Sequence, residues 1–295
     1  MSARVNERSV PGAEFPDSMT VSSSLDESFS ESDLVIVVVP SITVRENMKK
    51  IREAIPSDSN VLCATKGIEI ATGKRMSQVI GEELSGFDSD QIGVLSGPNL
   101  APEIAAGNPA TATVAFPSDQ IGEIVQEKLS SDVFRVYRSE DVTGVELGGA
   151  LKNIIAIGAG FIDGAELGGN TKAAFVTRGL HEITRLGVAM GALPDTFAGL
   201  SGMGDLVATS YSTLSRNYRL GMGLSSGSDL DSVLQDLGQT AEGAPTTQAA
   251  VRLARELGID MPIADATHAV LFEGADPSQV IRELMVRTLQ PEVRY

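Results

Sequence analysis

The chain is poor in the residues that usually build metal centres and disulfides. Its 295 residues include one cysteine, two histidines and no tryptophan. A single cysteine, Cys63, excludes an intrachain disulfide and any cluster held by several thiolates. The histidines, His181 and His268, stand far apart in sequence, so neither a histidine metal site nor a mechanism driven by histidine is expected. We therefore expect no metal.

Positive charge is scarce as well. The sequence has 23 lysines and arginines against 39 acidic residues, a net charge of -16. Nucleic acids and anionic membrane surfaces are therefore not expected partners, although a few local basic residues can still bind a small anion. No run of consecutive apolar residues is long enough to span a bilayer, and the opening MSARVNERSV lacks the apolar core of a secretory signal. We expect no membrane insertion and a cytoplasmic protein.

Strand and helix patterns alternate in the first half of the chain. The stretch LVIVVV at residues 34–39 is continuous and β-branched, which is typical of a parallel strand buried on both faces. Further strands are expected at 61–64, 92–95, 111–116 and 133–137, with helices at 44–55, 75–84 and 120–129. This alternation predicts an α/β fold with a doubly wound parallel sheet. Residues 1–32 are polar and serine-rich, a composition that would allow a disordered tail.

The pattern changes after about Val142, where only helical periodicity and glycine-rich turns follow. Helices are expected at 145–162, 172–190, 194–200, 217–224, 230–237, 246–257, 263–271 and 277–285. The chain is thus predicted to divide into an α/β part, residues 1–142, and an all-α part, residues 143–295.

One apolar, glycine-rich stretch, VELGGALKNIIAIGAGFIDGAELGGN at residues 145–170, carries a lysine in its middle. If the stretch is helical, Gly148, Ala156 and Gly160 share the face of Lys152 and leave it nearly free of side chains, so a ligand or another backbone can approach the ammonium group. Burial there would lower the lysine pKa, as a general base requires. The alternative, which the local context alone favours, is a lysine whose stem packs on apolar surface while its ammonium group reaches water.

Three loops are expected at the carboxyl ends of strands, where open α/β sheets bind ligands. They are Pro40-Ser41, Thr65-Lys66-Gly67 and Ser96-Gly97-Pro98. Lys66 directly follows a strand and precedes a glycine, so it is a plausible ligand for a phosphate or a carbonyl. The alternative is an exposed loop lysine.

The second half of the chain holds further polar candidates. Ser215-Arg216-Asn217 has the form of a serine-capped helix start with an arginine in its first turn, which suits an anion, although an ordinary N-cap with a surface arginine is an equal alternative. Asp205 could cap a turn, hold a lysine ammonium group or bind substrate hydroxyls. Glu242 says little without its context. Together these residues describe an anion site that faces a lysine.

The motifs resemble those of the bacterial NAD(P)-dependent glycerol-3-phosphate dehydrogenase family. They are, in order, VPGAEFP, DLVIVVVPS, ATKGIE, VLSGPNLAPEIAAG, GALKNIIAIGAGFIDGAELGGN, GLSGMGDLVAT, LSRN, QTAEG and MPI. The resemblance implies a partial Rossmann-like dinucleotide-binding domain at residues 1–142 and an all-α substrate domain of the 6-phosphogluconate-dehydrogenase-like type at 143–295. It also implies hydride transfer between sn-glycerol 3-phosphate and dihydroxyacetone phosphate with NAD or NADP, feeding glycerophospholipid synthesis, and a homodimer.

Roles for individual residues follow from the same resemblance. Lys152 is similar to the family's proton acceptor. The implied substrate-binding residues are Lys66, Gly97, Lys152, Asp205, Ser215, Arg216 and Asn217. The implied cofactor-binding residues are Lys66, Ala101, Arg216, Thr240 and Glu242. Asn99 stands where many members have serine or threonine, and we assign it no role.

The sequence departs from the family in one respect. No strand followed by G-x-G-x-x-G precedes Leu34, and that loop normally cradles the pyrophosphate of the dinucleotide. We therefore expect this chain to bind NAD(P)H poorly and to be poorly soluble or inactive, and the strand at Leu34 to expose an apolar edge. The residues that usually decide between NAD and NADP are missing with that segment. Two other functions stay open, namely a non-catalytic protein that binds phosphorylated trioses or a partner subunit, and a relative that acts on another small hydroxy acid.

Overall fold

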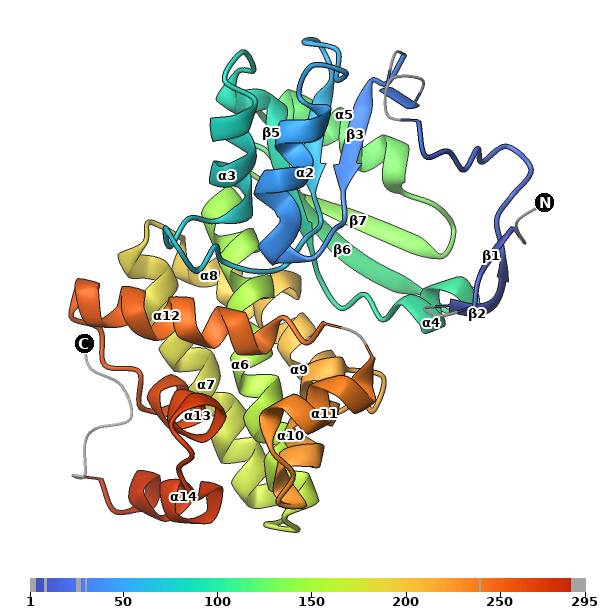
Figure 1. Ribbon diagram of the computed structural model, residues 1–295. Coiled ribbons are helices and arrows are strands. Elements are labelled where there is room, and N and C mark those ends of the chain that lie inside the picture. Colours follow the sequence, from blue (N-terminus) through green and yellow to red (C-terminus); the bar gives the residue numbers. More distant parts are fainter. Residues whose placement is uncertain (1–3, 8–9, 25–27, 30, 239, 288–295) are drawn as a thin grey trace.

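The computed structural model describes residues 4–7, 10–24, 28–29, 31–238 and 240–287. A five-stranded sheet forms the upper part of the molecule in Figure 1, and a group of helices forms the lower part. The strands are β3 (Leu34–Val37), β4 (Asn60–Cys63), β5 (Ile92–Ser96), β6 (Ala110–Ala115) and β7 (Phe134–Ser139), and they lie side by side in this order. The α/β fold predicted for this half is confirmed.

The predicted Rossmann-like sheet is present, but it is mixed, because one of its four strand pairs departs from the parallel arrangement. The pairs β3–β4, β4–β5 and β6–β7 are parallel, whereas β6 runs antiparallel to β5. The connection from β5 to β6 contains only the five-residue helix α4 (Ala101–Ala105). Because a parallel return needs a full crossover, usually a longer helix, the chain turns back in the opposite direction here.

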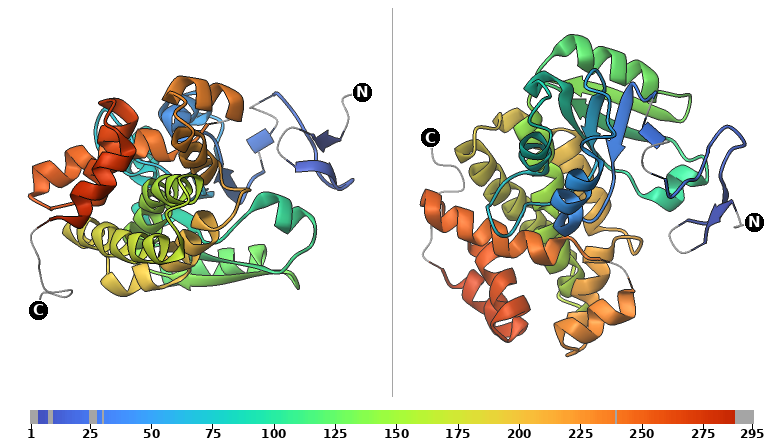
Figure 2. Two further views of the ribbon diagram at one scale, coloured as in Figure 1. Left: turned by 90° about the horizontal axis from the view of Figure 1, so that it is seen from below. Right: turned by 45° about the horizontal axis from the view of Figure 1, so that its top comes forward.

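Helices cover both faces of the sheet (Figure 2). On one face lie α2 (Val44–Ile51) and α3 (Met76–Glu83), whose Met48 and Ile80 pack with Val35 of β3 and Val94 of β5. On the other face α5 (Asp119–Leu129) places Val125 in a core with residues of β4, β6 and β7. Two short 3-10 turns, η1 (Ser41–Thr43) and η2 (Ser89–Gln91), complete this half. The apolar side chains of the strands therefore form two small cores, one on each side.

The edge of the sheet at β3 is apolar and exposed. Within the described ranges β3 pairs only with β4. Ile36 and Val38 are 46% and 68% exposed, so the predicted apolar edge is confirmed.

A small hairpin lies in the segment whose composition would allow a disordered tail. Its strands, β1 (Val5–Asn6) and β2 (Val10–Glu14), pair antiparallel, and β2 lies against α4 (Figure 1). Polar composition did not predict this hairpin.

The lower part is helical, as predicted, and its helices surround α6 (Val142–Gly164). The others are α7 (Gly169–Ala189), α8 (Pro194–Ala198), α9 (Asp205–Ser210), α10 (Arg216–Ser225), α11 (Leu230–Leu237), α12 (Gly243–Leu257), α13 (Pro262–Phe272) and α14 (Pro277–Met285), with a π-helical turn, η3 (Leu200–Gly204), before α9. All eight predicted helices are present, and the periodicity missed the short helices α4 and α9. The chain passes from sheet to helices between Ser139 and Val142, close to the predicted division, which stays a prediction as a domain boundary.

Helix α6 is long and apolar enough, by length and composition, to cross a membrane, although it contains no uninterrupted apolar run of that length. Interruptions such as Lys152 hide the length of its apolar run in the sequence. In the structure 94% of the relevant window is buried inside the protein. Its apolar surface is therefore covered by the neighbouring helices.

Candidate active site

Two lysines, one from each half of the molecule, share a buried aspartate. The Nζ atom of Lys152, on α6, lies 2.8 Å from Oδ1 of Asp205, at the start of α9. Lys66, in the loop after β4, places its Nζ atom 2.5 Å from Oδ2 of the same carboxylate and donates a hydrogen bond of 3.1 Å to the Gly97 carbonyl. Lys152 is only 5% exposed, so the alternative in which its ammonium group reaches water is wrong.

Burial and charge act in opposite directions on Lys152. Burial is the largest effect and lowers its pKa to about 8, reinforced by the charges of Lys66 and Arg216 and opposed by Asp205. For Asp205 the two ammonium groups outweigh burial and hold the carboxyl pKa below its usual range. Lys152 can therefore lose a proton close to neutral pH while Asp205 stays ionised.

Thr209 completes this group, and sequence reasoning missed it. The Lys152 ammonium group donates to Oγ1 of Thr209, which in turn donates to Oδ1 of Asp205 over 3.1 Å. Thr209 stands one turn after Asp205 on α9, so the spacing within GDLVAT places both side chains on one helix face. That spacing was the available signal. The threonine fixes the direction in which the ammonium group points.

The glycines on the Lys152 side of α6 accommodate other backbone segments. A Cβ atom at Gly148 would lie 2.9 Å from the Ser201 carbonyl oxygen, and one at Gly160 would lie 2.0 Å from that of Tyr218. The predicted face without side chains therefore lets other backbone segments come close to α6. This is one of the two predicted uses of that face, the other being the approach of a ligand. Through Gly160 this approach brings the start of α10 against α6.

The predicted anion-binding trio forms the start of α10. Ser215 caps the helix by accepting a hydrogen bond of 3.2 Å from the Tyr218 N–H, and Asn217 accepts one of 2.8 Å from the Gly243 N–H at the start of α12. Arg216 is exposed and lowers the Lys152 pKa through its charge. The three residues thus combine a helix N-terminus with a guanidinium group whose field reaches Lys152.

A second buried lysine fixes α10 to α6 and α7. Lys172, on α7, lies 2.5 Å from Asp163 of α6, and the Tyr218 hydroxyl donates to the same carboxylate over 2.6 Å. The Lys172 ammonium group also lies 3.9 Å from the centre of the Tyr211 ring, a cation–π distance. The connection from α9 to α10 is therefore held at both ends by the Lys172–Asp163 pair, at its start through Tyr211 and beyond its end through Tyr218.

Of the residues expected to bind the cofactor, Lys66 and Glu242 lie at the carboxyl ends of the strands. Glu242 accepts hydrogen bonds from the backbone N–H of Ser41, over 3.1 Å, and from its hydroxyl group. Thr240 is half-buried two positions before Glu242. Ala101 is exposed at the start of α4, and no contact brings it to the other residues in the part of the chain described. Within the described ranges, Arg216 is linked to this group through its charge, which acts on Lys152.

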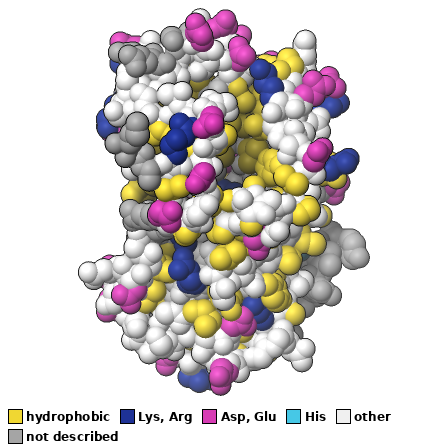
Figure 3. Space-filling view, turned by 90° about the vertical axis from the view of Figure 1, so that its right-hand side faces the viewer, with side chains coloured by type: hydrophobic (Ala, Val, Ile, Leu, Met, Phe, Trp, Pro, Cys, Tyr) yellow, Lys and Arg dark blue, Asp and Glu magenta, His cyan; other side chains and the backbone are white. Residues whose placement is uncertain are grey.

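Unpartnered polar atoms beside Gly97 test whether a polar ligand fits here. Ser96 Oγ and Asn99 Oδ1 are buried and have no hydrogen-bond partner among the residues described. A Cβ atom at Gly149 would lie 2.2 Å from Ser96 Oγ and 3.6 Å from the stem of Lys66, so this hydroxyl lies close to the two-lysine group. Such atoms fit the polar end of a nicotinamide or a substrate. Figure 3 views the molecule from the right-hand side of Figure 1 and shows hydrophobic side chains gathered in a hollow of the upper part.

The strand ends of a Rossmann-like sheet face a buried lysine of lowered pKa, and the second half of the chain is helical. This combination is typical of a class of nicotinamide-dependent dehydrogenases with an all-α second domain. Comparison with protein families makes this specific. The model described as "NAD-dependent glycerol-3-phosphate dehydrogenase N-terminus" matches residues 1–122, and that for the C-terminus matches residues 141–282. The chain belongs to the family of NAD-dependent glycerol-3-phosphate dehydrogenases.

Individual relatives agree with this assignment. The chain is 44% identical to a glycerol-3-phosphate dehydrogenase [NAD(P)+] of Dehalococcoides mccartyi over 92% of its own length and 76% of the relative's. It is 45% identical to the enzyme of the same description from Shouchella clausii, over 98% of its own length and 85% of the relative's. The crystal structure of glycerol-3-phosphate dehydrogenase from Coxiella burnetii superposes with a TM-score of 0.92 at 36% identity, covering 97% of this chain and 86% of that one.

Proposed function

We propose that the protein interconverts sn-glycerol 3-phosphate and dihydroxyacetone phosphate, with NAD or NADP as the hydride carrier. The observation that carries this proposal is the Lys152 ammonium group, buried against Asp205 with a pKa of about 8. A general base works best when its pKa is near the operating pH. The family relationship supports the choice of substrate.

In this proposal each residue has one task. Neutral Lys152 accepts the proton of the C2 hydroxyl during oxidation, and its ammonium form returns a proton during reduction. The bound nicotinamide supplies the hydride chemistry. Asp205 and Lys66 hold the hydroxyl-bearing carbon beside Lys152, with Lys66 fixed in turn by the Gly97 carbonyl.

The phosphate of the substrate is assigned to the start of α10. Ser215, Arg216 and Asn217 join a helix N-terminus to a guanidinium group, and both favour an anion. For the cofactor, Lys66, Glu242, Thr240, Ala101 and Arg216 remain the proposed contacts.

The pH dependence of both directions tests the base. Oxidation of glycerol 3-phosphate should rise as the pH passes through about 8, because Lys152 must be neutral. Reduction of dihydroxyacetone phosphate should fall over the same range. Lys152→Met should lower both rates roughly 10²–10⁴-fold, whereas Lys50→Met, at an exposed position of α2, should leave them unchanged. Wild-type rates in Lys152→Met would show that the base is assigned wrongly.

The same assays separate the alternatives. Binding of glycerol 3-phosphate without turnover by either NAD or NADP would favour a non-catalytic triose phosphate binder. Arg216→Ala should weaken glycerol 3-phosphate far more than a phosphate-free alcohol, and equal losses would favour another hydroxy acid as the substrate. The poor binding of NAD(P)H by this chain also remains a prediction, and tight cofactor binding measured by calorimetry would refute it. The homodimer and the cytoplasmic location remain predictions, which sedimentation and cell fractionation test.

A further inference from the structure

The loop that carries Lys66, residues 64–75, is folded onto both halves of the molecule. Ile68 is only 1% exposed and packs in the core of the helical part. Behind it the loop closes on itself, because Ile68 pairs with Arg75 and the Glu69 N–H donates to the Lys74 carbonyl over 2.9 Å. Lys66 therefore projects from a structured turn.

Its far end is attached to the helices. Nη1 of Arg75 lies 2.6 Å from Oε2 of Glu146 on α6, and the buried carboxylate also accepts hydrogen bonds from the N–H and hydroxyl groups of Ser77. A Cβ atom at Gly73 would lie 2.9 Å from the Leu253 side chain of α12. The helical half therefore holds one side of the loop.

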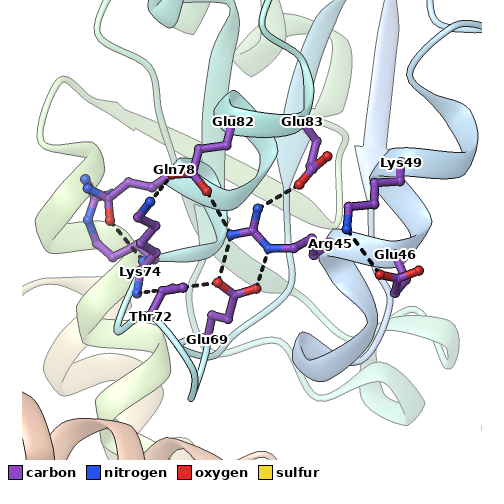
Figure 4. Close-up of polar contacts among 10 residues, drawn as sticks. Arg45, Glu46, Lys49, Glu69, Thr72, Lys74, Gln78, Glu82 and Glu83 are labelled. Atoms are coloured by element: carbon purple, nitrogen blue, oxygen red, sulfur yellow. Dashed lines mark hydrogen bonds and ion pairs between the residues drawn. The ribbon is translucent and has the colours of Figure 1, made fainter.

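Arg45, on α2, holds the other side (Figure 4). Its Nε and Nη2 atoms each lie 2.8 Å from one oxygen of Glu69, so the pair is bidentate. The remaining donors reach Glu83 over 2.7 Å and Glu82 over 2.8 Å on α3. Only a planar guanidinium group can satisfy carboxylates in three directions in this way, and a lysine in its place would lose the fork.

We propose that Arg45 is a positioning residue for Lys66. By binding Glu69 it keeps loop 64–75 where the Lys66 ammonium group bridges the Gly97 carbonyl and Asp205. Without the guanidinium group Glu69 loses its bidentate partner and is repelled by Glu83 of α3. Lys74 still binds Glu82, so the loop keeps that link to α3 while the segment from Lys66 to Glu69 moves away. The importance of this position for catalysis rests on the function proposed above.

A displaced Lys66 changes the titration of Lys152. The charged groups that act on Lys152 are Lys66 from the loop, Asp205 from α9 and Arg216 from α10. Because the charge of Lys66 lowers the Lys152 pKa, moving it away raises that pKa. The pH at which oxidation reaches half its maximum should therefore increase, a shift that simple loss of stability would not produce.

Arg45→Met is the main test, with Lys49→Met as its matched control. Lys49 is an exposed lysine on the same helix that contacts only Glu46 among the described residues, so the two variants lose the same charge. For Arg45→Met we expect faster hydrogen exchange in residues 65–75, faster reductive methylation of Lys66 and a KM for glycerol 3-phosphate roughly tenfold higher. Its oxidation profile should also shift to higher pH, while kcat at the plateau should stay within about twofold.

Three further variants sharpen the result. Glu69→Gln should reproduce the effects of Arg45→Met, and Arg45→Lys should be intermediate. Glu83→Gln should resemble wild type, because Glu83 binds Arg45 but neither belongs to the loop nor pairs with it in the part of the chain described. Glu82 does not serve this purpose, because it also binds Lys74 of the loop. Equal behaviour of Arg45→Met and Lys49→Met would overturn the proposal. So would faster exchange in the loop with unchanged Lys66 methylation, since Lys66 would then keep its place without Arg45.

Failure of the proposed function gives a different result. If the wild-type protein neither binds nor oxidises glycerol 3-phosphate, the function is wrong, yet hydrogen exchange and Lys66 methylation still decide whether Arg45 positions Lys66. If wild type is active and only the methylation rates agree between Arg45→Met and Lys49→Met, the positioning role is wrong and the function stands.

Discussion

Replacing Asp205 by asparagine leaves two ammonium groups without their shared counter-charge. Asp205 is 2% exposed and lies 2.8 Å from Lys152 and 2.5 Å from Lys66. Removing one partner of a buried ion pair typically costs about 3–5 kcal/mol. The lower end applies here, because Lys66 keeps some contact with water and Lys152 can release its proton. A loss of about 3 kcal/mol corresponds to a fall in Tm of roughly 6–12 °C.

The pH dependence of this loss identifies its cause. Without Asp205, burial, Lys66 and Arg216 still lower the Lys152 pKa, so it should fall below about 8. Between the Lys152 pKa of the variant and that of wild type, folded wild type keeps the Lys152 proton and the folded variant has lost it. The stability deficit of the variant relative to wild type therefore shrinks as the pH rises through this interval. A shift of one pKa unit reduces it by about 1.4 kcal/mol.

Thermal unfolding of wild type and Asp205→Asn at pH 6 and pH 9 measures both effects. Asp132→Asn, at an exposed position before β7, controls for the loss of one negative charge. A deficit that is the same at both pH values would refute the electrostatic reasoning, because a purely steric defect does not titrate with Lys152. A deficit as small as that of the control would show that the carboxylate is not shared by two charged lysines.

Two other changes test the helix packing and a buried carboxyl group. A Cβ atom at Gly221 would lie 1.9 Å from the Ile157 carbonyl oxygen, so Gly221→Ala should push α10 away from α6. This variant should be destabilised by roughly 2–3 kcal/mol and should have a higher KM for glycerol 3-phosphate. The control Gly122→Ala, where the nearest atom would lie 4.0 Å away, should show neither effect, and equal unfolding midpoints of the two variants would contradict the prediction. Burial raises the pKa of Glu182 to about 7 from an ordinary 4.5, although the carboxyl group accepts the Ile263 N–H at the start of α13. Because the folded protein binds this proton more tightly than the unfolded chain, the stability of wild type should decline as the pH rises from about 5 to 8. Glu182→Gln should flatten the profile of Tm against pH. Parallel profiles of the two proteins would count against the assignment of this pH dependence to Glu182.

Much of the fold follows from local patterns. The β-branched run at 34–39 and the helical periodicity after Val142 depend on which side chains are buried in each element, and burial repeats with the period of the element itself. The strands and the longer helices were therefore predictable to within a few residues. The helices α4 and α9 were not, because one or two turns contain too few residues to display a period.

The direction of β6 shows the limit of the same reasoning. An apolar strand pattern reads the same in a parallel and in an antiparallel pair, so Thr111 to Ala115 could not reveal that they run against β5. The length and course of the β5–β6 connection decided it.

For the site, the sequence by itself indicated most of the proposed participants, although it did not reveal Thr209. The motif around Lys152, the strand-end position of Lys66 and the serine-capped start of α10 were visible as residue types in local context, and the family followed from them. Local context left open whether the Lys152 ammonium group is buried. It also left open whether Asp205 caps a turn, binds a lysine ammonium group or binds substrate hydroxyls.

Only the tertiary structure decided how these residues act together. Lys66 and Asp205 stand 139 positions apart, and Ser41 and Glu242 stand 201 apart, so no local pattern could pair them. The pKa of Lys152 depends on charges that α9, α10 and the loop after β4 bring to it, and the position of that loop depends on Arg45. Electrostatic energy falls with distance in space, whereas the sequence reports only distance along the chain.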